Sequence, residues 1–96
     1  MIIVSQGRED IYNFDNVKSI DIVENEIYIT DDILADRGVK IGEYATEERA
    51  KKVLRKIMQC YTNTEQYKCF SNNSNKNYET LNYLIKNSFI YEMPEE

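Results

Sequence analysis

The chain has 96 residues, and 42% of them are hydrophobic, which is enough to build one folded domain but not two. Its formal net charge is -5, so it lacks the basic surface with which proteins bind DNA or RNA in general. It contains no histidine and only two cysteines, which excludes triads with an imidazole base and zinc sites built from four cysteine or histidine ligands. We therefore expect a binding protein rather than an enzyme, with no cofactor and no metal.

The first 45 residues carry the signals of an antiparallel β-meander. Polar turns separate short β-branched or alternating stretches at 1–4, 11–14, 17–23, 26–30 and 39–44. In the clearest hairpin, Ile20 and Ile22 fall on one face of a strand, while Ser19 and Asp21 fall on the other. The pattern predicts four to five strands.

The pattern changes to a helical period at Thr46, a suitable N-cap that two acidic residues follow. One apolar stripe then runs through Ala50, Val53, Leu54, Ile57, Met58 and Tyr61. We predict a long helix over residues 46–61. Residues 62–77 form a polar, asparagine-rich insertion that is typical of an exposed loop. Residues 78–93 are expected to form a short second helix, over 78–86, and a strand, over 89–93.

Together these elements predict a single α+β domain over residues 1–96. An antiparallel meander of four to five strands carries the long helix across it, and the C-terminal strand returns to the sheet. The residues expected in the core are Phe14, Ile20, Ile22, Ile27, Ile29, Ile41, Val53, Leu54, Ile57 and Tyr91. An exposed sheet edge beside so small a core favours a homodimer.

Four stretches of the sequence, taken together, carry a resemblance to a group of proteins. They are Met-Ile-Ile-Val-Ser-Gln at 1–6, Asn-Phe-Asp-Asn at 13–16, Gly-Glu-Tyr and Thr-Glu-Glu-Arg-Ala within 42–50, and Tyr-Glu-Met-Pro at 91–94. In this order they resemble small proteins of Firmicutes phages and mobile elements, and the resemblance skips residues 62–87. It implies a phage-encoded inhibitor of host defence, similar either to anti-CRISPR proteins, which occupy a nucleic-acid site, or to anti-Thoeris sponges, which sequester a signalling nucleotide. It carries over no catalytic residues.

The expected partner is therefore a host defence protein or nucleoprotein complex, and the alternative is a signalling nucleotide. No apolar run is long enough to span a membrane, and the first residues lack the basic stretch of a secretion signal. We expect a cytoplasmic protein of the host cell that has no membrane partner.

Acidic side chains are the first candidates for contacting a protein partner. Glu9 and Asp10 lie in a predicted turn, and Asp31 and Asp32 begin an acidic loop that ends at Gly38. A surface of this kind imitates a phosphate backbone, although solubility explains the same charges. The aspartates are also capable of acid-base chemistry or of holding Mg²⁺, but turn formation is the preferred interpretation.

An aromatic pair is the second candidate. Tyr67 and Phe70 flank Cys69 inside the polar insertion, where a hydrophobic cluster is unexpected. Such a cluster is suited to gripping a partner, and the insertion either stays disordered or folds when the partner binds.

Basic side chains of the long helix are the candidates for the alternative function. Residues 46–58 carry five bases and two acids, so this segment is positive although the chain is negative. Arg49, Lys52 and Lys56 are spaced to share one helix face, where they would accept the phosphates of a nucleotide. The other interpretation is the solvated face of an amphipathic helix, which the spacing from Glu48 to Lys52 supports.

Overall fold

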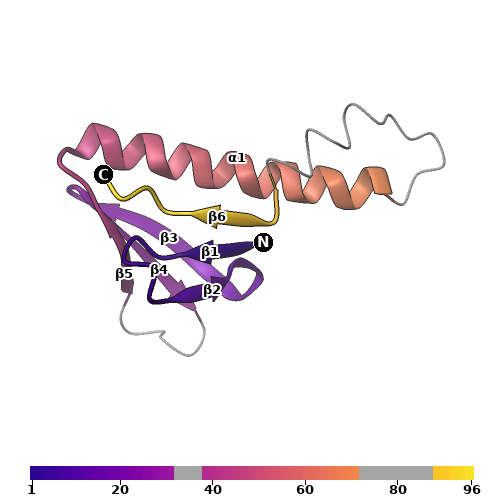
Figure 1. Ribbon diagram of the computed structural model, residues 1–96, viewed down its shortest axis with the longest axis horizontal. Coiled ribbons are helices and arrows are strands. Elements are labelled where there is room, and N and C mark those ends of the chain that lie inside the picture. The colour runs from indigo at the N-terminus through magenta and orange to yellow at the C-terminus, as the bar shows by residue number, and fades with distance from the viewer. Residues whose placement is uncertain (32–37, 72–87) are drawn as a thin grey trace.

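The computed structural model of the protein describes residues 1–31, 38–71 and 88–96. In this part of the chain, two three-stranded sheets accompany one long helix (Figure 1). Sheet A has the strand order β2-β1-β6, and sheet B has the order β3-β4-β5. The elements are β1 (Ile2–Val4), β2 (Ile11–Asn13), the 3-10 helix η1 (Phe14–Asn16), β3 (Val17–Val23), β4 (Glu26–Asp31), β5 (Val39–Glu43), α1 (Glu47–Ser71) and β6 (Ile90–Glu92). The predicted α+β class is confirmed.

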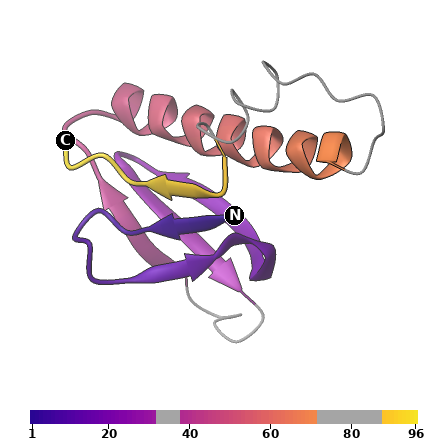
Figure 2. The same ribbon diagram turned by 45° about the vertical axis from the view of Figure 1, so that its right-hand side comes forward.

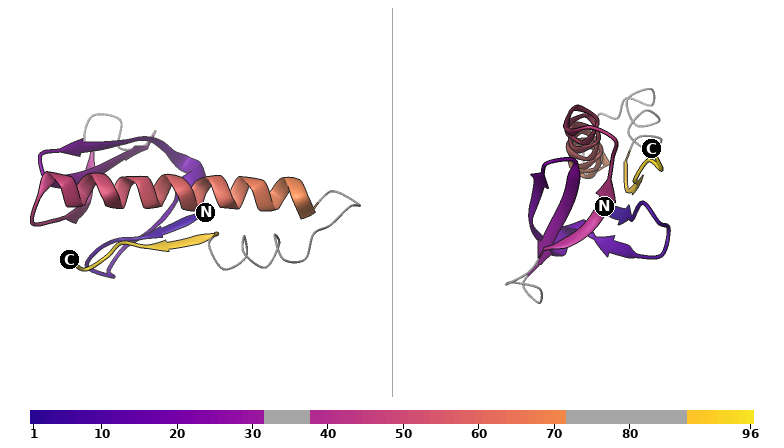
Figure 3. Two further views of the ribbon diagram at one scale, coloured as in Figure 1. Left: turned by 90° about the horizontal axis from the view of Figure 1, so that it is seen from above. Right: turned by 90° about the vertical axis from the view of Figure 1, so that its left-hand side faces the viewer.

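The helix lies across both sheets. Figure 2 shows α1 running above β6 and the strands of sheet B. In the end-on view of Figure 3, one sheet lies on each side below the helix. Ile3 of β1, Ile27 of β4 and Ile57 of α1 are completely buried. Side chains from all three layers therefore meet in one core.

The predicted single meander is wrong, because the strands divide between two sheets. β3, β4 and β5 do form an antiparallel meander, but β1 pairs with β2 on one side and with β6 on the other. The chain leaves sheet A at η1, where the Asn13 side chain accepts a hydrogen bond from the N–H of Asp15 (3.0 Å) and the N–H of Val17 donates to the carbonyl of Phe14. This local turn prevents β2 from continuing into β3 within one sheet.

The C-terminal strand is present as β6, and it runs parallel to β1. The N–H of Ile2 donates to the carbonyl of Phe89 (2.6 Å), and the N–H of Met93 donates to that of Val4 (3.0 Å). Residues 93–96 follow without regular structure, yet each of their main-chain oxygens accepts a hydrogen bond from a distant side chain. In chain order the donors are Arg8 (2.6 Å), Tyr44 (2.9 Å), Gln6 (2.8 Å) and Arg49 (3.0 Å).

The helix is longer than predicted. It begins as expected, since the Thr46 hydroxyl accepts a hydrogen bond from the N–H of Arg49 (3.1 Å), but it continues beyond residue 61 to Ser71. The prediction that residues 62–71 belong to a polar loop is therefore wrong. Thr64 explains why: its hydroxyl is fully buried, donates to the carbonyl of Cys60 (2.9 Å) and accepts from the N–H of Phe89 (2.9 Å). The rest of the insertion, the predicted helix over 78–86 and most of the predicted acidic loop lie outside the described residues.

Half of the residues predicted for the core are buried, and most of the others lie at its boundary. Of the predicted residues, Ile27, Ile29, Ile41, Val53 and Ile57 are buried, while Phe14, Ile20, Ile22 and Tyr91 are half-buried and pack against them. Leu54 is only half-buried and lies outside this cluster. Buried positions outside the predicted core are Met1, Ile3, Tyr44, Cys60 and Met93, while Ala50 is buried as its place on the predicted apolar stripe indicates. Met1 and Ile3 are at β1 and Met93 follows β6, whereas Tyr44 follows β5 and Cys60 lies on α1.

Candidate functional site

The face of sheet A that points away from the core is apolar and exposed. Neighbouring residues in adjacent strands share a face, so the pairs Ile2 with Ile90 and Val4 with Ile11 lie on the same side. Ile2, Ile11 and Ile90 are 40%, 69% and 60% exposed, whereas the opposite row contains the buried Ile3. We call Ile2, Val4, Ile11 and Ile90 the outer patch. Asn13 and Glu92 share this face, opposite Ile2 and Val4 respectively, so the apolar side chains form a diagonal band across the sheet from Ile11 to Ile90.

The outer patch has an acidic border. Glu9 and Asp10 are exposed in the turn between β1 and β2, and Glu92 is exposed at the end of β6. Arg8 stands among them, but its guanidinium is already engaged, with Glu92 (3.8 Å) and with the carbonyls of Met93 (2.6 Å) and Ser5 (3.3 Å). The border therefore carries a net negative charge.

Two of the predicted acidic residues act electrostatically on Tyr12 in β2. Burial raises the pKa of the Tyr12 hydroxyl, and the negative charges of Asp10 and Asp31 raise it further. Asp10 precedes β2, whereas Asp31 ends β4 in the other sheet, so carboxylates from two separate parts of the chain act on Tyr12. Of the four predicted acids, Glu9, Asp10 and Asp31 are thus described, and Asp32 lies outside the described residues.

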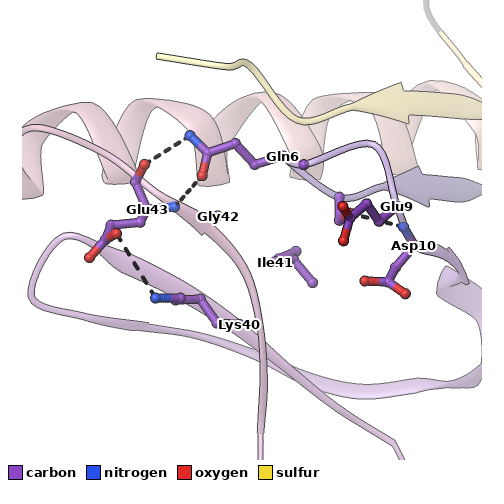
Figure 4. A pocket seen from close by; sticks show the side chains of 9 residues that line it. Gln6, Glu9, Asp10, Lys40, Ile41, Gly42 and Glu43 are labelled. Atoms are coloured by element: carbon purple, nitrogen blue, oxygen red, sulfur yellow. Dashed lines mark hydrogen bonds and ion pairs between the residues drawn. The ribbon is translucent and has the colours of Figure 1, made fainter.

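A polar hollow of about 220 Å³ lies between the β1–β2 turn and β5 (Figure 4). On one side the Gln6 side-chain amide donates to the carbonyl of Glu43 (2.8 Å) and accepts from its N–H (2.7 Å). Glu9 and Asp10 line the other side, and Lys40 forms an ion pair with Glu43 (3.9 Å). Because Gln6 satisfies the main chain of β5 as a neighbouring strand would, it joins the two sheets beside this hollow.

The aromatic pair is not part of a loop cluster. Tyr67 lies on α1, is half-buried, and packs edge-on against Phe89 with ring centroids 5.0 Å apart. This contact fixes the helix to the start of β6, at the end of sheet A opposite Glu9 and Asp10. Phe70 also belongs to α1, and its side chain lies outside what the structure describes. The two predicted protein-binding groups are therefore not brought together.

The predicted phosphate-binding face is only partly available. The Arg49 guanidinium donates twice to the main-chain oxygen of Glu96 (3.1 and 3.0 Å) and lies 5.8 Å from the centre of the Tyr44 ring. Lys52 and Lys56 are exposed, and Arg55 is exposed on the turn between them. None of these three forms an ion pair within the described part of the chain, whereas Glu47 pairs with Lys51 (3.4 Å). The accessible cations are Lys52, Arg55 and Lys56.

The described residues contain no group of three or more histidine, cysteine, aspartate or glutamate side chains placed to hold a metal ion. Both cysteines are free thiols: Cys69 is exposed on α1, whereas Cys60 is buried. Burial raises the pKa of the Cys60 thiol, which points to the carbonyl of Ile90 (3.9 Å). A raised pKa disfavours the reactive thiolate, so Cys60 has the character of a packing residue.

Sequence reasoning missed the outer patch, although a signal was present. The run Ile2-Ile3-Val4 is apolar at every position, so a strand formed by it exposes apolar side chains on both faces. A fully covered strand has this pattern too, and only the observed pairing shows that one face stays open.

Comparisons with known proteins found no match among family models, curated proteins or solved structures. Within the described residues, no helix is both long enough and apolar enough to cross a membrane.

Proposed function

We propose that this protein is a non-enzymatic binding protein that docks on another protein through the outer patch. The observation that supports the proposal is the exposure of Ile2, Ile11 and Ile90 on one face of sheet A. Removing such apolar area from water stabilises a complex by about 25 cal/mol per Å² before the costs of association. Large apolar side chains gathered on one face are typical of surfaces that a partner covers.

The acidic border selects the kind of partner. Glu9, Asp10 and Glu92 lie at the end of sheet A where Val4 pairs with Ile11 and Glu92, on a protein whose net charge is -5, so a complementary surface is apolar at its centre and basic along that one edge. Proteins that handle nucleic acids present basic surfaces of this kind. The charge pattern is thus consistent with the resemblance to phage inhibitors: an anti-CRISPR-like protein that docks on a basic host defence protein or nucleoprotein complex inside the host cell.

The test is to capture a target and to substitute the patch. The tagged protein is incubated with a lysate of a low-GC Gram-positive bacterium, and the retained protein is identified by mass spectrometry and purified. Ile11→Arg and Ile90→Arg are each expected to weaken binding of that protein at least tenfold, because each adds a charge to the apolar face and repels a basic partner.

Val23→Arg is the matched control, because Val23 is an exposed residue (56%) on sheet B, away from the patch. It should bind like the wild type, and all three variants should unfold at the wild-type temperature. The proposal fails if Val23→Arg weakens binding as much as the patch variants, or if the patch variants bind normally.

A second candidate function is the sequestration of a signalling nucleotide, which Lys52, Arg55 and Lys56 favour because they are exposed cations on adjacent helical turns. Cyclic and ADP-ribose-type nucleotides should then raise the melting temperature of the wild type. The Lys52→Gln/Arg55→Gln double variant should lose this shift, and Lys18→Gln on β3 should retain it. If no such nucleotide raises the melting temperature of the wild type, the sponge function is rejected.

A further inference from the structure

The two sheets have four edge strands in the described part of the chain, and three of them are covered or blunted. On β6, the carbonyl of Ile90 faces the thiol of Cys60 on α1. On β5, the main-chain and side-chain amides of Gln6 bond to the backbone. On β3, the pairing with β4 shifts register around Lys18, and a bulge with a lysine is a common means of protecting an edge.

The edge of β2 differs from these. In an antiparallel pair, residues alternate between rungs that bond to the partner strand and rungs that point outward. The N–H of Ser5 donates to the carbonyl of Asp10 (2.9 Å) and that of Phe14 donates to the carbonyl of Met1 (2.9 Å), which fixes the bonded rungs. Ile11 therefore turns its main-chain N–H and C=O away from β1, and Asn13 turns its N–H away, while the C=O of Asn13, the N-cap residue, begins η1.

We propose that β2 is the docking edge of this protein and that an extended, basic segment of the partner adds to it as a fourth strand of sheet A. This deepens the proposed function, on which it rests, by naming the mode of recognition. Ile11, the most exposed large hydrophobic residue described, stands beside this edge on the outer patch. An added strand would cover it with alternate side chains while its main chain bonds to Ile11 and Asn13.

The charges around β2 favour a basic segment over a second copy of this chain. Glu9 and Asp10 precede the strand, and the exposed Asp15 follows it. Antiparallel pairing of two copies about Tyr12 would place Glu9 of one copy opposite Asp15 of the other at both ends. Like charges in opposite positions destabilise a strand pair, whereas lysines in the added strand would meet these carboxylates favourably.

Asn13→Pro tests the main-chain bond directly. Asn13 has φ -81°, which a proline ring tolerates, and Tyr12 before it is in a strand, as the residue preceding proline requires. The substitution removes an N–H that β1 does not use. Asn13→Ala is the matched control, because both variants lose the side-chain hydrogen bond to Asp15 but only the proline variant loses the donor.

The probe is an amidated heptapeptide of alternating lysine and valine, with an alternating glutamate and valine peptide as its control. On binding of the lysine peptide, the amide hydrogens of Ile11 and Asn13 should change from rapid to slow exchange with solvent, measured by NMR. The Asn13→Pro variant should bind it at least tenfold more weakly than Asn13→Ala, and the glutamate peptide should not bind.

Four results would overturn the proposal, and three of them concern the two Asn13 variants and the amides of β2. They are equal binding to the two Asn13 variants, binding without protection of the Ile11 and Asn13 amides, and protection of those amides by self-association in the absence of peptide, which would assign the edge to a second copy. No binding at millimolar peptide also rejects it. Failure here is distinct from failure of the proposed function: a captured target that is sensitive to Ile90→Arg but binds equally to both Asn13 variants uses the outer patch without strand addition.

Discussion

Replacing Gly42 by alanine should destabilise the protein, because a methyl group there meets two buried side chains. A Cβ atom on Gly42 would lie 2.8 Å from Met93 Cε, 3.0 Å from Tyr44 Cε2 and 3.1 Å from the Tyr44 hydroxyl. Optimal carbon contacts are about 3.5–4.0 Å, so Met93 must move by roughly 1 Å. Both neighbours are fully packed, and the Tyr44 hydroxyl donates to the carbonyl of Pro94 (2.9 Å), which opposes the shift.

Overpacking of this kind costs about 1–3 kcal/mol, and a weakened Tyr44 hydrogen bond costs about 1 kcal/mol more. Removing a glycine restores about 0.4–1 kcal/mol by restricting the unfolded chain. The expected net loss is about 2 kcal/mol, which for a domain of this size corresponds to a melting temperature lower by roughly 8–16 °C. Urea unfolding at equilibrium and differential scanning calorimetry measure the two quantities.

Gly7→Ala is the matched control for this prediction. A Cβ atom on Gly7 meets nothing within 4 Å, and Gly7 does not have a positive φ. Its stability should equal that of the wild type or exceed it by up to about 1 kcal/mol. The reasoning is refuted if Gly42→Ala unfolds within about 0.5 kcal/mol of the wild type, which is the usual range of a neutral substitution, or if Gly7→Ala loses as much stability.

Three further perturbations test the side-chain hydrogen bonds and the buried tyrosine that connect the parts of the fold. Gln6→Glu replaces an amide donor by a carboxylate that faces two main-chain carbonyls, so urea unfolding should show a loss of stability of about 1–3 kcal/mol. The control Gln59→Glu, on the exposed face of α1, should be neutral. Equal losses in the two variants would contradict the role of the Gln6 amide as a donor to both carbonyls. Thr64→Val removes the buried hydroxyl that accepts from the N–H of Phe89 at the start of β6, and it should lower the free energy of unfolding by about 1–3 kcal/mol. Thr62→Val, at an exposed position, is the control and should be nearly neutral. Comparable losses in the two variants would show that this hydrogen bond does not stabilise the fold. Burial raises the pKa of Tyr44 from its ordinary value of 10.0 to about 12, so the folded state binds this proton more tightly than the unfolded chain. The urea midpoint should therefore fall as the pH rises from 10 through 12, and it should fall more steeply in the wild type than in Tyr44→Phe. If the midpoints of the two proteins fall in parallel, the pH dependence does not come from Tyr44.

The sequence predicted the local structure of the described residues better than their pairing. The alternation at Ile20 and Ile22 and the cap at Thr46 are short-range signals, and β3 and α1 begin where these signals place them. The placement of β1 beside β6 depends instead on contacts between residues almost 90 positions apart. A sequence pattern of period two specifies a strand but not its neighbour, so a single meander was the natural but incorrect prediction.

The end of the helix was misjudged for a different reason. Asn63 and Thr64 are polar and were therefore assigned to a loop, yet both are buried. The hydroxyl of Thr64 finds one partner within its own helix and another at Phe89, and only the folded arrangement of β6 supplies the second. Burial of a polar group is favourable when its hydrogen bonds are made, and composition alone does not show whether they are.

The candidate site was predicted in part, because the sequence identifies charges but not the surface to which they belong. Their acidity indicates Glu9 and Asp10 as candidates, and the structure gives them a position at the border of an apolar face. Arg49 was chosen for its helical spacing with Lys52, but its guanidinium reaches back to the main chain of Glu96. Spacing along a helix predicts which side chains share a face. The group that a long side chain contacts depends on the tertiary structure around it.

The turn that carries the acidic border is held rigidly, which bears on how the site would bind. Ser5 accepts a hydrogen bond from the N–H of Asp10 (3.2 Å), Gln6 bonds to β5, and Arg8 bonds to the carbonyl of Met93. These anchors come from both sheets and the C-terminal segment, so the main chain of the turn that carries Glu9 and Asp10 is ordered before any partner arrives. A binding surface that is already ordered loses less conformational entropy on association, so more of the contact energy appears as affinity. The side chains that join the two sheets thereby also organise the acidic border of the outer patch.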